Sequence, residues 1–463
     1  MTVHALSEEG VSALAADFAG ELVAPGDDEY EQARRVWNGM INARPALVAY
    51  CTGAADVRAA VAFARERGVP VTVRGGGHGV AGNAVVDGGL VVDLSAMDDV
   101  RVDPDERRVR VGGGAQWADV DRETQQFGLA VPGGVVSDTG VAGLTLGGGL
   151  GHLRRAYGAS CDSLRSADVV TADGDLVVAS AERNADLFWA LRGGGGNFGV
   201  VTSFEFDCHP VGPEVETAFV WYRGDEAREV FAAFREYAAD APREVSALPF
   251  YAWVPDEADF PESSWGDPTV VVLGCYAGDP EEGEDALRPV RELADPLADF
   301  SGRMAYAELQ TMLDADYPHG RYYYWKSVYL DELTDDVLDR VLGHAETCPS
   351  KLTTIDFWQL GGAIAEVGED ETAFPNRDAA YLLNYEANWD DPRETETNVR
   401  WARECVEDVR ELDAVRGQYV NFPGMGEDAA EVAYGESYGR LADVKETYDP
   451  ENVFRGHQNV GPR

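Results

Sequence analysis

The chain has 463 residues, too many for one ordinary hydrophobic core, and 45% of them are apolar, so two or three packing units are expected. Its 83 acidic and 38 basic residues give a formal net charge of −45. This charge argues against nucleic acid or an anionic membrane as a partner, because both would repel such a surface. The six cysteines lie far apart without a CxxC pair, so neither a metal site nor a disulfide framework is expected.

The acidic residues are spread along the whole chain rather than gathered in a tail, and lysine occurs only at Lys326, Lys351 and Lys445. Diffuse acidity of this size is a feature of proteins from high-salt cells, so we expect a halophilic, cytoplasmic protein. The alternative is an acidic proteome encoded by a GC-rich genome. The N-terminus MTVHALSEEG lacks the basic and apolar regions of a secretory signal, and no apolar run reaches 18 residues.

The first part of the chain predicts mixed helices and strands. Residues 1–45 predict two helical stretches and a linker. The order strand (46–50), helix (54–68), strand (69–73) then indicates α/β organisation. Further elements are predicted up to residue 206: strands at 90–94, 108–111, 169–171, 176–179 and 200–206, and helices at 115–127 and 186–192.

The composition changes near residues 210–213, where the glycine clusters end. Alternating apolar patterns and acidic helices follow, and they predict a second domain at 211–417. The tail at 418–463 returns to aromatic and Asn-rich sequence, so we expect it to rejoin the first domain at 1–210.

The segment Val73–Gly79 places a histidine inside a run of glycines, RGGGHG. Consecutive glycines let backbone N–H groups approach an anion such as a pyrophosphate. The segment is not a Walker A loop, because the Lys and Ser/Thr of that motif are missing, and no long helix follows as a Rossmann motif requires. A structural turn is the alternative, but a neutral imidazole is also a nucleophile, and here it would stand beside the bound group.

Two more glycine-rich segments follow at 140–151 and 192–202. Six glycines within 140–151 are interleaved with Val, Leu and Thr, which favours a wall of a cofactor channel over a flexible linker. The segment at 192–202 leads directly into a strand, and by itself fits a tight turn as well as a nucleotide site. Three such segments in one domain are far more specific than any one of them.

Together these motifs resemble the vanillyl-alcohol-oxidase/PCMH-type FAD-binding superfamily, and within it the berberine-bridge-enzyme-like and 6-hydroxy-D-nicotine-oxidase-like oxidases. The resemblance covers essentially the whole chain. The segments that carry it are RGGGHG (74–79), SDTGVAGLTLGGGLG (137–151), YGASCDSLRSADVVTADG (157–174), RGGGGNFGVVT (192–202) and YVNF…YDPENVFRGHQN (419–459).

The resemblance implies an α+β fold: an FAD-binding domain of two α/β subdomains, completed by the C-terminal segment, and a substrate domain whose antiparallel sheet is covered by helices. It implies that His78 is bonded to FAD. Val136 stands where some relatives carry a cysteine with a second flavin bond, so we expect a single link, and we expect Cys161 to be a buried apolar residue. The expected cofactor-binding residues are Arg74, Gly75, Gly76, Gly77, His78, Gly79, Ser137, Asp138, Gly140, Gly143, Thr145, Gly147, Gly148, Gly149, Gly151, Asn197, Gly199, Val201 and Asn459.

In relatives a tyrosine at the place of Tyr419 stands over the flavin as the general base. With an ordinary pKa near ~10 it needs a partner at neutral pH, and Lys326 is a candidate; Asn421 is also expected among the catalytic residues. An interdomain salt bridge is the alternative for Lys326, a core aromatic for Tyr419 and a polar cap for Asn459. Aromatic residues that line a substrate cavity or belong to the core are Tyr322, Tyr323, Trp325, Phe357 and Trp358.

The resemblance implies an FAD-dependent oxidase. It would take hydride from a small alcohol, sugar or amine and return the electrons to oxygen. A dehydrogenase with another acceptor, an NADPH-using reductase of the same fold and a flavin-binding protein without turnover are the alternatives. No metal is expected.

Overall fold

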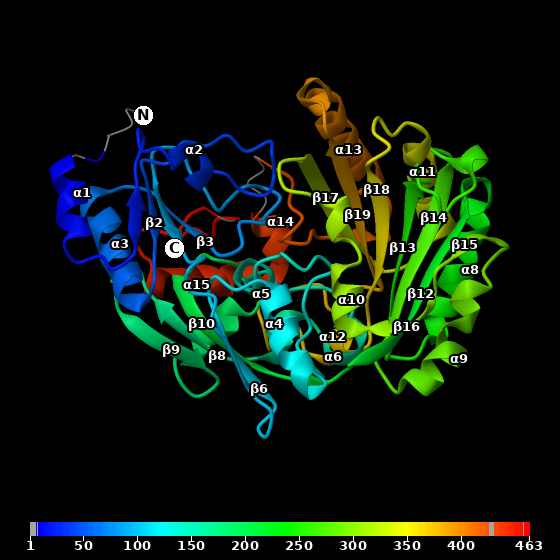
Figure 1. Cartoon of the computed structure of the whole chain (residues 1–463), viewed down its shortest axis with the longest axis horizontal. Coiled ribbons are helices and arrows are strands. Elements are labelled where there is room, and N and C mark those ends of the chain that lie inside the picture. Colours follow the sequence, from blue (N-terminus) through cyan, green and yellow to red (C-terminus); the bar gives the residue numbers. More distant parts are fainter. Residues whose placement is uncertain (1–5, 7, 426–429, 457) are drawn as a thin grey trace.

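The computed structural model describes residues 6, 8–425, 430–456 and 458–463, and the chain folds around three large β-sheets. Two smaller sheets and the C-terminal segment form a first lobe, and one broad sheet with its helices forms a second lobe (Figure 1). Helices and strands are thus partly segregated, and the expected α+β class, with an antiparallel sheet in the second lobe, is confirmed.

The first sheet has the order β1-β2-β4-β3, with β2, β4 and β3 parallel and β1 antiparallel to β2. β2 and β3 run parallel on either side of β4, so the chain must cross over between them, and α3 (Ala54–Arg67) supplies this crossover. Gly68 ends this helix in the left-handed conformation, at φ 64°. The other elements of this part are α1 (Glu8–Ala15), β1 (Glu21–Val23), α2 (Tyr30–Ala33), β2 (Leu47–Tyr50), β3 (Val71–Arg74) and β4 (Leu90–Asp93).

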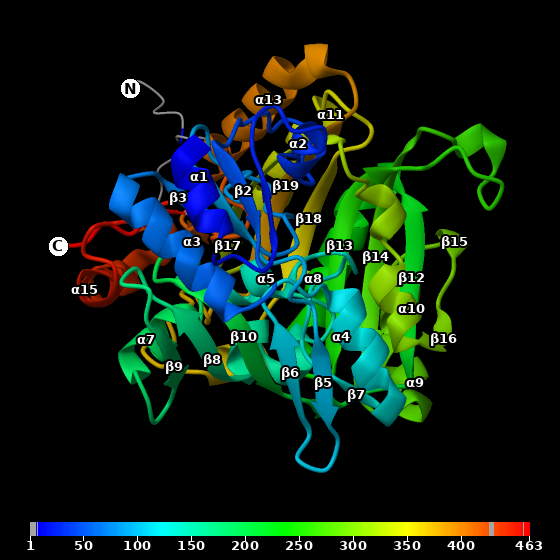
Figure 2. The ribbon, with the colours of Figure 1, turned by 60° about the vertical axis from the view of Figure 1, so that its left-hand side comes forward.

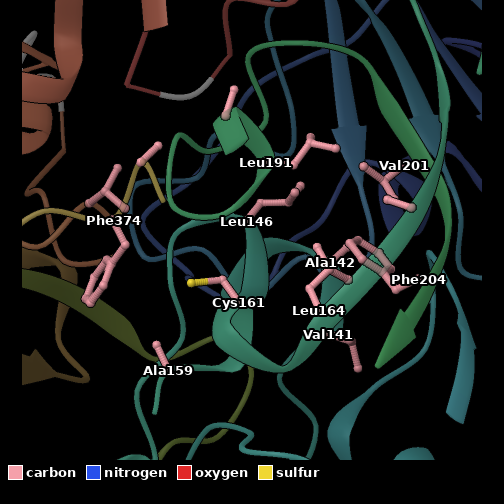
Figure 3. Close-up of a cluster of buried hydrophobic side chains, with 14 of the residues drawn as sticks. Val141, Ala142, Leu146, Ala159, Cys161, Leu164, Leu191, Val201, Phe204 and Phe374 are labelled. Carbon is pink, nitrogen blue, oxygen red and sulfur yellow. The ribbon is translucent and has the colours of Figure 1, made fainter. Parts of the chain in front are cut away.

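The second sheet is antiparallel, in the order β5-β6-β10-β8-β9, and short helices pack on it (Figure 2). Figure 3 shows part of the core beneath it, where Cys161 lies among Leu146, Leu164 and Phe374. Cys161 is therefore a core residue. The elements are β5 (Val100–Asp103), β6 (Arg108–Gly112), α4 (Trp117–Thr124), β7 (Leu129–Ala130), α5 (Val141–Leu146), α6 (Arg154–Tyr157), β8 (Leu164–Val170), β9 (Leu176–Ser180), α7 (Ala185–Leu191), β10 (Val200–Asp207) and β11 (His209–Pro210).

The second lobe is built on a nine-stranded sheet in the order β15-β12-β14-β13-β18-β19-β17-β20, with β16 beside β12. Its strands are β12 (Glu214–Arg223), β13 (Val245–Trp253), β14 (Pro268–Tyr276), β15 (Pro296–Asp299), β16 (Gly302–Ala305), β17 (Tyr322–Leu330), β18 (Thr354–Gln359), β19 (Tyr381–Trp389) and β20 (Val415–Arg416). Its helices are α8 (Ala227–Asp240), α9 (Pro280–Arg291), α10 (Tyr306–Thr311), α11 (Asp335–Glu346), α12 (Ala363–Glu366) and α13 (Thr395–Val409).

The two faces of this sheet have different neighbours. Apolar residues of α8, α9, α11 and α13 cover one face of the sheet, where they pack against sheet residues such as Tyr385 and Val328. Successive side chains of a strand point to opposite faces, so Trp325, Trp358 and Glu386 lie on the other face, toward the first lobe.

The C-terminal segment returns to the first lobe after β20. It carries α14 (Ala430–Tyr434) and α15 (Tyr438–Tyr448), and α15 packs on α7. Fully buried Lys445 donates to Asp449 Oδ2 at 2.6 Å and to the carbonyl oxygens of Asn197 and Phe454 at 2.7 and 2.6 Å. One ammonium group therefore ties the tail to the third glycine segment.

Two consecutive arginines on α6, Arg154 and Arg155, join the lobes from the first-lobe side. Both are buried, and they donate to backbone carbonyls of the second lobe rather than to carboxylates. The carbonyl oxygens are those of Gln359 and Ala247 for Arg154, and of Val245, Leu360 and Ala241 for Arg155.

Among the described residues, no helix is long and apolar enough to cross a membrane.

Candidate active site

A cavity of about 240 Å³ lies where the two lobes meet. The first lobe lines it with the loop after β3, the start of α5, and Gly196, Gly199 and Val201. The second lobe closes it with Trp325, Trp358, Asp356 and Glu386, from the sheet face described above. The lining is largely apolar, with a few polar groups, as in a typical small-molecule site.

The first two glycine segments touch each other at this cavity. A Cβ built on Gly76 would meet the Cα of Gly140 at 2.6 Å, and one on Gly140 would meet the nitrogen of Gly76 at 2.4 Å, so neither position has room for a side chain. Gly143 and Gly79, by contrast, have no protein atom within 4 Å of such a Cβ, because they border open space. The predicted cofactor residues that line the cavity are Gly75, Gly76, Gly77, His78, Gly79, Gly140, Gly143, Gly199 and Val201.

Other predicted cofactor residues make contacts within the protein instead. The guanidinium of Arg74 donates to Asp93 and to the carbonyl oxygens of Ala33 and Arg35, on the side of the loop away from this cavity. Ser137 gives its hydroxyl to Asp314 of the second lobe at 2.6 Å. The structure therefore places both side chains in the protein framework and outside the cavity lining.

The glycines at 147–151 serve close packing between segments. A Cβ on Gly147, Gly148, Gly149 or Gly151 would collide with Asn421, Phe374, Ser160 or the Gly133 carbonyl, respectively. Asn197 is also structural: its amide donates to the carbonyl oxygens of Gly194 and Gln458 at 2.9 and 3.1 Å.

Two of the predicted cofactor-binding residues each have a polar atom that makes no hydrogen bond to the described residues. The Thr145 hydroxyl and the Asn459 side-chain oxygen are buried and have no hydrogen-bond partner among the described residues. Neither residue lines the cavity, and the neighbouring His457 lies outside the described residues.

His78 is held between an indole and a carboxylate. Its ring stacks on Trp37, with centroids 4.2 Å apart, and its Nε2 lies 3.0 Å from Asp138 Oδ1, close enough for an ion pair although not aligned as a hydrogen bond. The other oxygen, Asp138 Oδ2, is 2.8 Å from His319 Nε2. Burial raises the pKa of Asp138, but the contacts with His319 and His78 outweigh it and hold this pKa well below its usual range.

Two carboxyl groups that the sequence did not single out, Asp356 and Glu386, face the same cavity. Thr354 pairs with Glu386 and Asp356 with Asn384, so the two acids are diagonal neighbours on one face of β18 and β19. Tyr317 Oη and Asn384 Nδ2 each donate to Glu386 at 2.7 Å, whereas Asp356 Oδ1 has no partner among the described residues. Burial raises the pKa of both acids, and repulsion from Glu386 raises that of Asp356 further.

Tyr419 and Lys326 are not brought together. Tyr419 is buried beside the cavity, and its hydroxyl accepts from Asn421 Nδ2 at 2.9 Å and from Gly149 N at 3.2 Å. Its backbone N–H donates to Ser327 Oγ, so it lies on the face of β17 that carries Ser327 and Trp325. Lys326 projects from the opposite face, against Gly424. Asn421 lines the cavity, but Tyr419 and Lys326 do not.

The same alternation separates the five candidate aromatics. Trp325 and Trp358 line the cavity, while Phe357 and Tyr322 pack on the helix-covered face. Tyr323 stacks on Trp37, with centroids 3.7 Å apart, and supports His78 from behind. Of the two alternatives left open for these residues, Phe357 and Tyr322 therefore belong to the core, since their strand positions have the opposite parity.

Comparison with known proteins gives the family. Residues 45–180 match the model of an FAD binding domain, and residues 418–461 match the model of berberine and berberine-like proteins. The chain is 33% identical over 458 residues to an uncharacterized FAD-linked oxidoreductase of Bacillus subtilis, covering 96% of this chain and 97% of that one. The chain belongs to the berberine-like FAD-linked oxidoreductases.

Solved relatives of this family have the same fold. The chain is 30% identical to (R)-6-hydroxynicotine oxidase of Paenarthrobacter nicotinovorans, over 96% of this chain and 97% of that one. The structure of 6-hydroxy-D-nicotine oxidase from Arthrobacter nicotinovorans matches with a TM-score of 0.86 at 28% identity, covering 96% of this chain and 98% of that one. BBE-like 1 of Physcomitrella patens matches with a TM-score of 0.87 at 25% identity, covering 98% and 99%.

The cavity of this berberine-like oxidoreductase fits FAD. Backbone N–H groups of the RGGGHG loop can approach a pyrophosphate, since the glycines leave no side chain in the way. Open positions at Gly79, Gly143 and Gly196 leave room along one wall for an extended cofactor.

Gly143→Ala separates cofactor binding from folding. We expect this variant to weaken FAD binding at least tenfold without lowering Tm, because the added methyl group meets no protein atom and enters only the cavity. Alanine also favours a helix interior over glycine by about 0.5–1 kcal/mol. The measurement is FAD affinity by flavin fluorescence, in a His78→Ala background, together with thermal unfolding.

Gly343→Ala on α11 is the matched control, because this helical glycine also faces open space but lies far from the cavity. It should keep the FAD affinity of the parent. Equal affinities in the two glycine variants would show that FAD does not pass Gly143.

Proposed function

We propose that this protein is an oxidase that carries FAD on His78 through a single covalent link and oxidises a small alcohol, sugar or amine. The observation that carries the proposal is one cavity lined by a glycine cradle with an imidazole on one side and two buried carboxyl groups on the other. Solved relatives named as nicotine and xylooligosaccharide oxidases support the reaction class. Val136 lines the cavity without a sulfur atom, which supports one link rather than two.

Bound FAD would supply hydride acceptance and electron transfer to oxygen. The protein must then remove a proton from the substrate hydroxyl or amine. Burial raises the pKa of both Asp356 and Glu386, and repulsion from Glu386 raises that of Asp356 further, so the pair is a candidate acceptor for this proton. Asp356 Oδ1 is the free acceptor, because the oxygens of Glu386 already accept from Tyr317 and Asn384.

We assign the base to this pair in preference to Tyr419. Burial raises the pKa of Tyr419 above its usual value of ~10, which moves the phenol away from neutrality. Burial raises a carboxyl pKa toward neutrality, where a general base is most effective. Asn421 then serves to hold the Tyr419 hydroxyl, and Lys326 stays outside the cavity.

The test is an anaerobic screen of alcohols, sugars and amines, followed by aeration. We expect at least one class to bleach the flavin and air to restore it with formation of hydrogen peroxide. Acid-precipitated protein should stay yellow, and His78→Ala protein should lose its colour. Bleaching without reoxidation by air would identify a dehydrogenase, and no bleaching by any substrate would favour a flavin-binding protein without turnover.

We also propose that the protein works in high salt. Its net charge of −45 destabilises the folded state by self-repulsion, and salt shortens the Debye length from about 10 Å at 0.1 M to about 3 Å at 1 M. We expect Tm to rise over that range of KCl, measured by calorimetry. Sucrose of equal osmolality is the control, and an equal rise in sucrose would mean that screening is not the cause.

A further inference from the structure

Three titratable groups form a row from the cavity to the surface. His78 Nε2 is 3.0 Å from Asp138 Oδ1, and Asp138 Oδ2 is 2.8 Å from His319 Nε2. The exposed fraction of the side chain rises along the row, from 9% for His78 through 34% for Asp138 to 59% for His319. The row therefore connects the buried imidazole with solvent.

The surroundings fix the ring of His78. Trp37 covers one face of this ring, and Tyr323 stacks on the far side of Trp37. The indole Nε1 of Trp37 donates to the Tyr317 carbonyl at 2.8 Å, which anchors the stack to the second lobe. The Asp138 carboxylate approaches the edge of the His78 ring at Nε2, whereas stacking on Trp37 fixes the plane of the ring.

A second cavity, of about 410 Å³, lies on the other side of the glycine loop. Its lining includes Gly75, Gly76, Gly77, Trp37 and His319. His319 thus borders a second space, distinct from the one that holds Asp356 and Glu386, and a proton that reaches it can leave without crossing the substrate site.

We propose that Asp138 and His319 are positioning residues for the attachment of FAD to His78: the negative charge of Asp138, 3.0 Å from Nε2, favours the tautomer with the proton on that nitrogen, and the pair provides the path by which the proton leaves. The inference rests on the proposed covalent link. With the proton on Nε2, the lone pair is on Nδ1, which is the nucleophile.

The attachment step balances with dioxygen as oxidant. A bond forms between Nδ1 and the 8α carbon of the flavin, while one C–H bond at that carbon and the Nε2–H bond break. Two protons and two electrons are released, and dioxygen takes them up as hydrogen peroxide. The Nε2 proton leaves along the row toward His319 and solvent, and the lowered pKa of Asp138 keeps its carboxylate negatively charged beside the imidazole.

The experiment follows attachment over time. Full-length protein, produced under riboflavin limitation, is mixed with FAD in air, and samples are precipitated with acid. Flavin in the pellet and the intact mass give the attached fraction. FAD affinity before attachment is measured by fluorescence at early times.

Asp138→Asn should slow attachment at least tenfold, and His319→Gln should slow it several-fold with unchanged initial FAD affinity. Imidazole in the buffer should restore the rate of His319→Gln, because the position is exposed and a soluble base can replace the ring. A merely structural role of His319 would not respond to imidazole. Asp408→Asn is the matched control: it breaks another contact of the same kind, His344 Nε2 to Asp408 Oδ2 at 3.1 Å, between α11 and α13, and should attach FAD at the wild-type rate.

Wild-type rates in both Asp138→Asn and His319→Gln would overturn the inference and leave the covalent link intact. A wild-type protein without any attached flavin would overturn the link itself and the inference with it. If Asp138→Asn fails to hold FAD, the His319→Gln arm decides: slow attachment rescued by imidazole supports the proposal, and a wild-type rate refutes it.

Discussion

Asp356→Asn is expected to lower kcat/KM by about 10²–10⁴-fold, the usual contribution of a positioned general base, while FAD stays attached. The amide cannot take up the substrate proton at the free Oδ1 position, although it fills the same space. Steady-state kinetics on the substrate found by the bleaching screen give the value, and the yellow acid precipitate shows that the cofactor is retained.

The pH profile adds a second readout. Because the pKa of the pair is raised, kcat/KM in the wild type should fall as pH drops through a value above the usual carboxyl range. In Asp356→Asn the repulsion between the two carboxylates is absent, so the pKa of Glu386 should be lower. The acidic limb of the kcat/KM profile for the residual activity should therefore move to lower pH.

Asp121→Asn is the control for burial alone. Burial raises the pKa of Asp121 to about 7, and this acid accepts from Gln310 rather than lining the cavity. It should leave kcat/KM unchanged. Normal kinetics in Asp356→Asn would return the role of base to another group, with Tyr419 the next to test.

Asp449→Asn is expected to cost about 3–5 kcal/mol of stability, because it leaves the ammonium of Lys445 buried without a counter-charge. Both side chains are fully buried, and Asp449 also accepts the N–H groups of Val453 and Phe454 at 2.8 and 2.9 Å. The loss should appear in denaturant unfolding followed by fluorescence.

An exposed pair supplies the comparison. Asp285 and Arg288 are one turn apart on α9, with half or more of each side chain exposed, and such pairs contribute about 0–1 kcal/mol. Asp285→Asn should therefore shift the unfolding midpoint little. Equal shifts in the two variants would mean that Lys445 finds other partners when Asp449 is neutral.

The glycine segments could be recognised as part of a binding site from the sequence alone, because so many glycines cost conformational entropy on folding and add no side chains to the core. The parallel β2–α3–β3 unit and the alternating strands of the second lobe could be predicted as well, since their periodicity is local. The FAD-binding and berberine-like character followed from the resemblance of five segments, which include the three glycine segments.

The acid pair could not be predicted in the same way. β19 alternates Leu383, Tyr385 and Ala387 with Asn384 and Glu386, which is the pattern of a strand with one face in water. Only the first lobe, packed over that face, turns an ordinary polar stripe into buried carboxyl groups. The burial of these carboxyl groups depends on how the two lobes pack together. A local sequence pattern carries no information about that packing.

The orientation of side chains in loops was the second feature that could not be predicted from the sequence. Arg74 and Ser137 stand next to cavity-lining residues in the chain, yet their side chains turn toward Asp93 and Asp314. Neighbours in the sequence share a loop, but a loop has no fixed period from which to infer which way each side chain points. The parity of Phe357 and Trp358, by contrast, was available from the strand pattern.

The arginine joint on α6 has a consequence for how this architecture diversifies. Arg154 and Arg155 hold the second lobe by its main-chain oxygens, which every amino acid presents alike. Substitutions along β13 and β18 can thus remodel the chamber that receives the substrate while the seating of one lobe on the other stays constant. Selection for a new substrate can act on those strands without changing the contacts that hold the two lobes together.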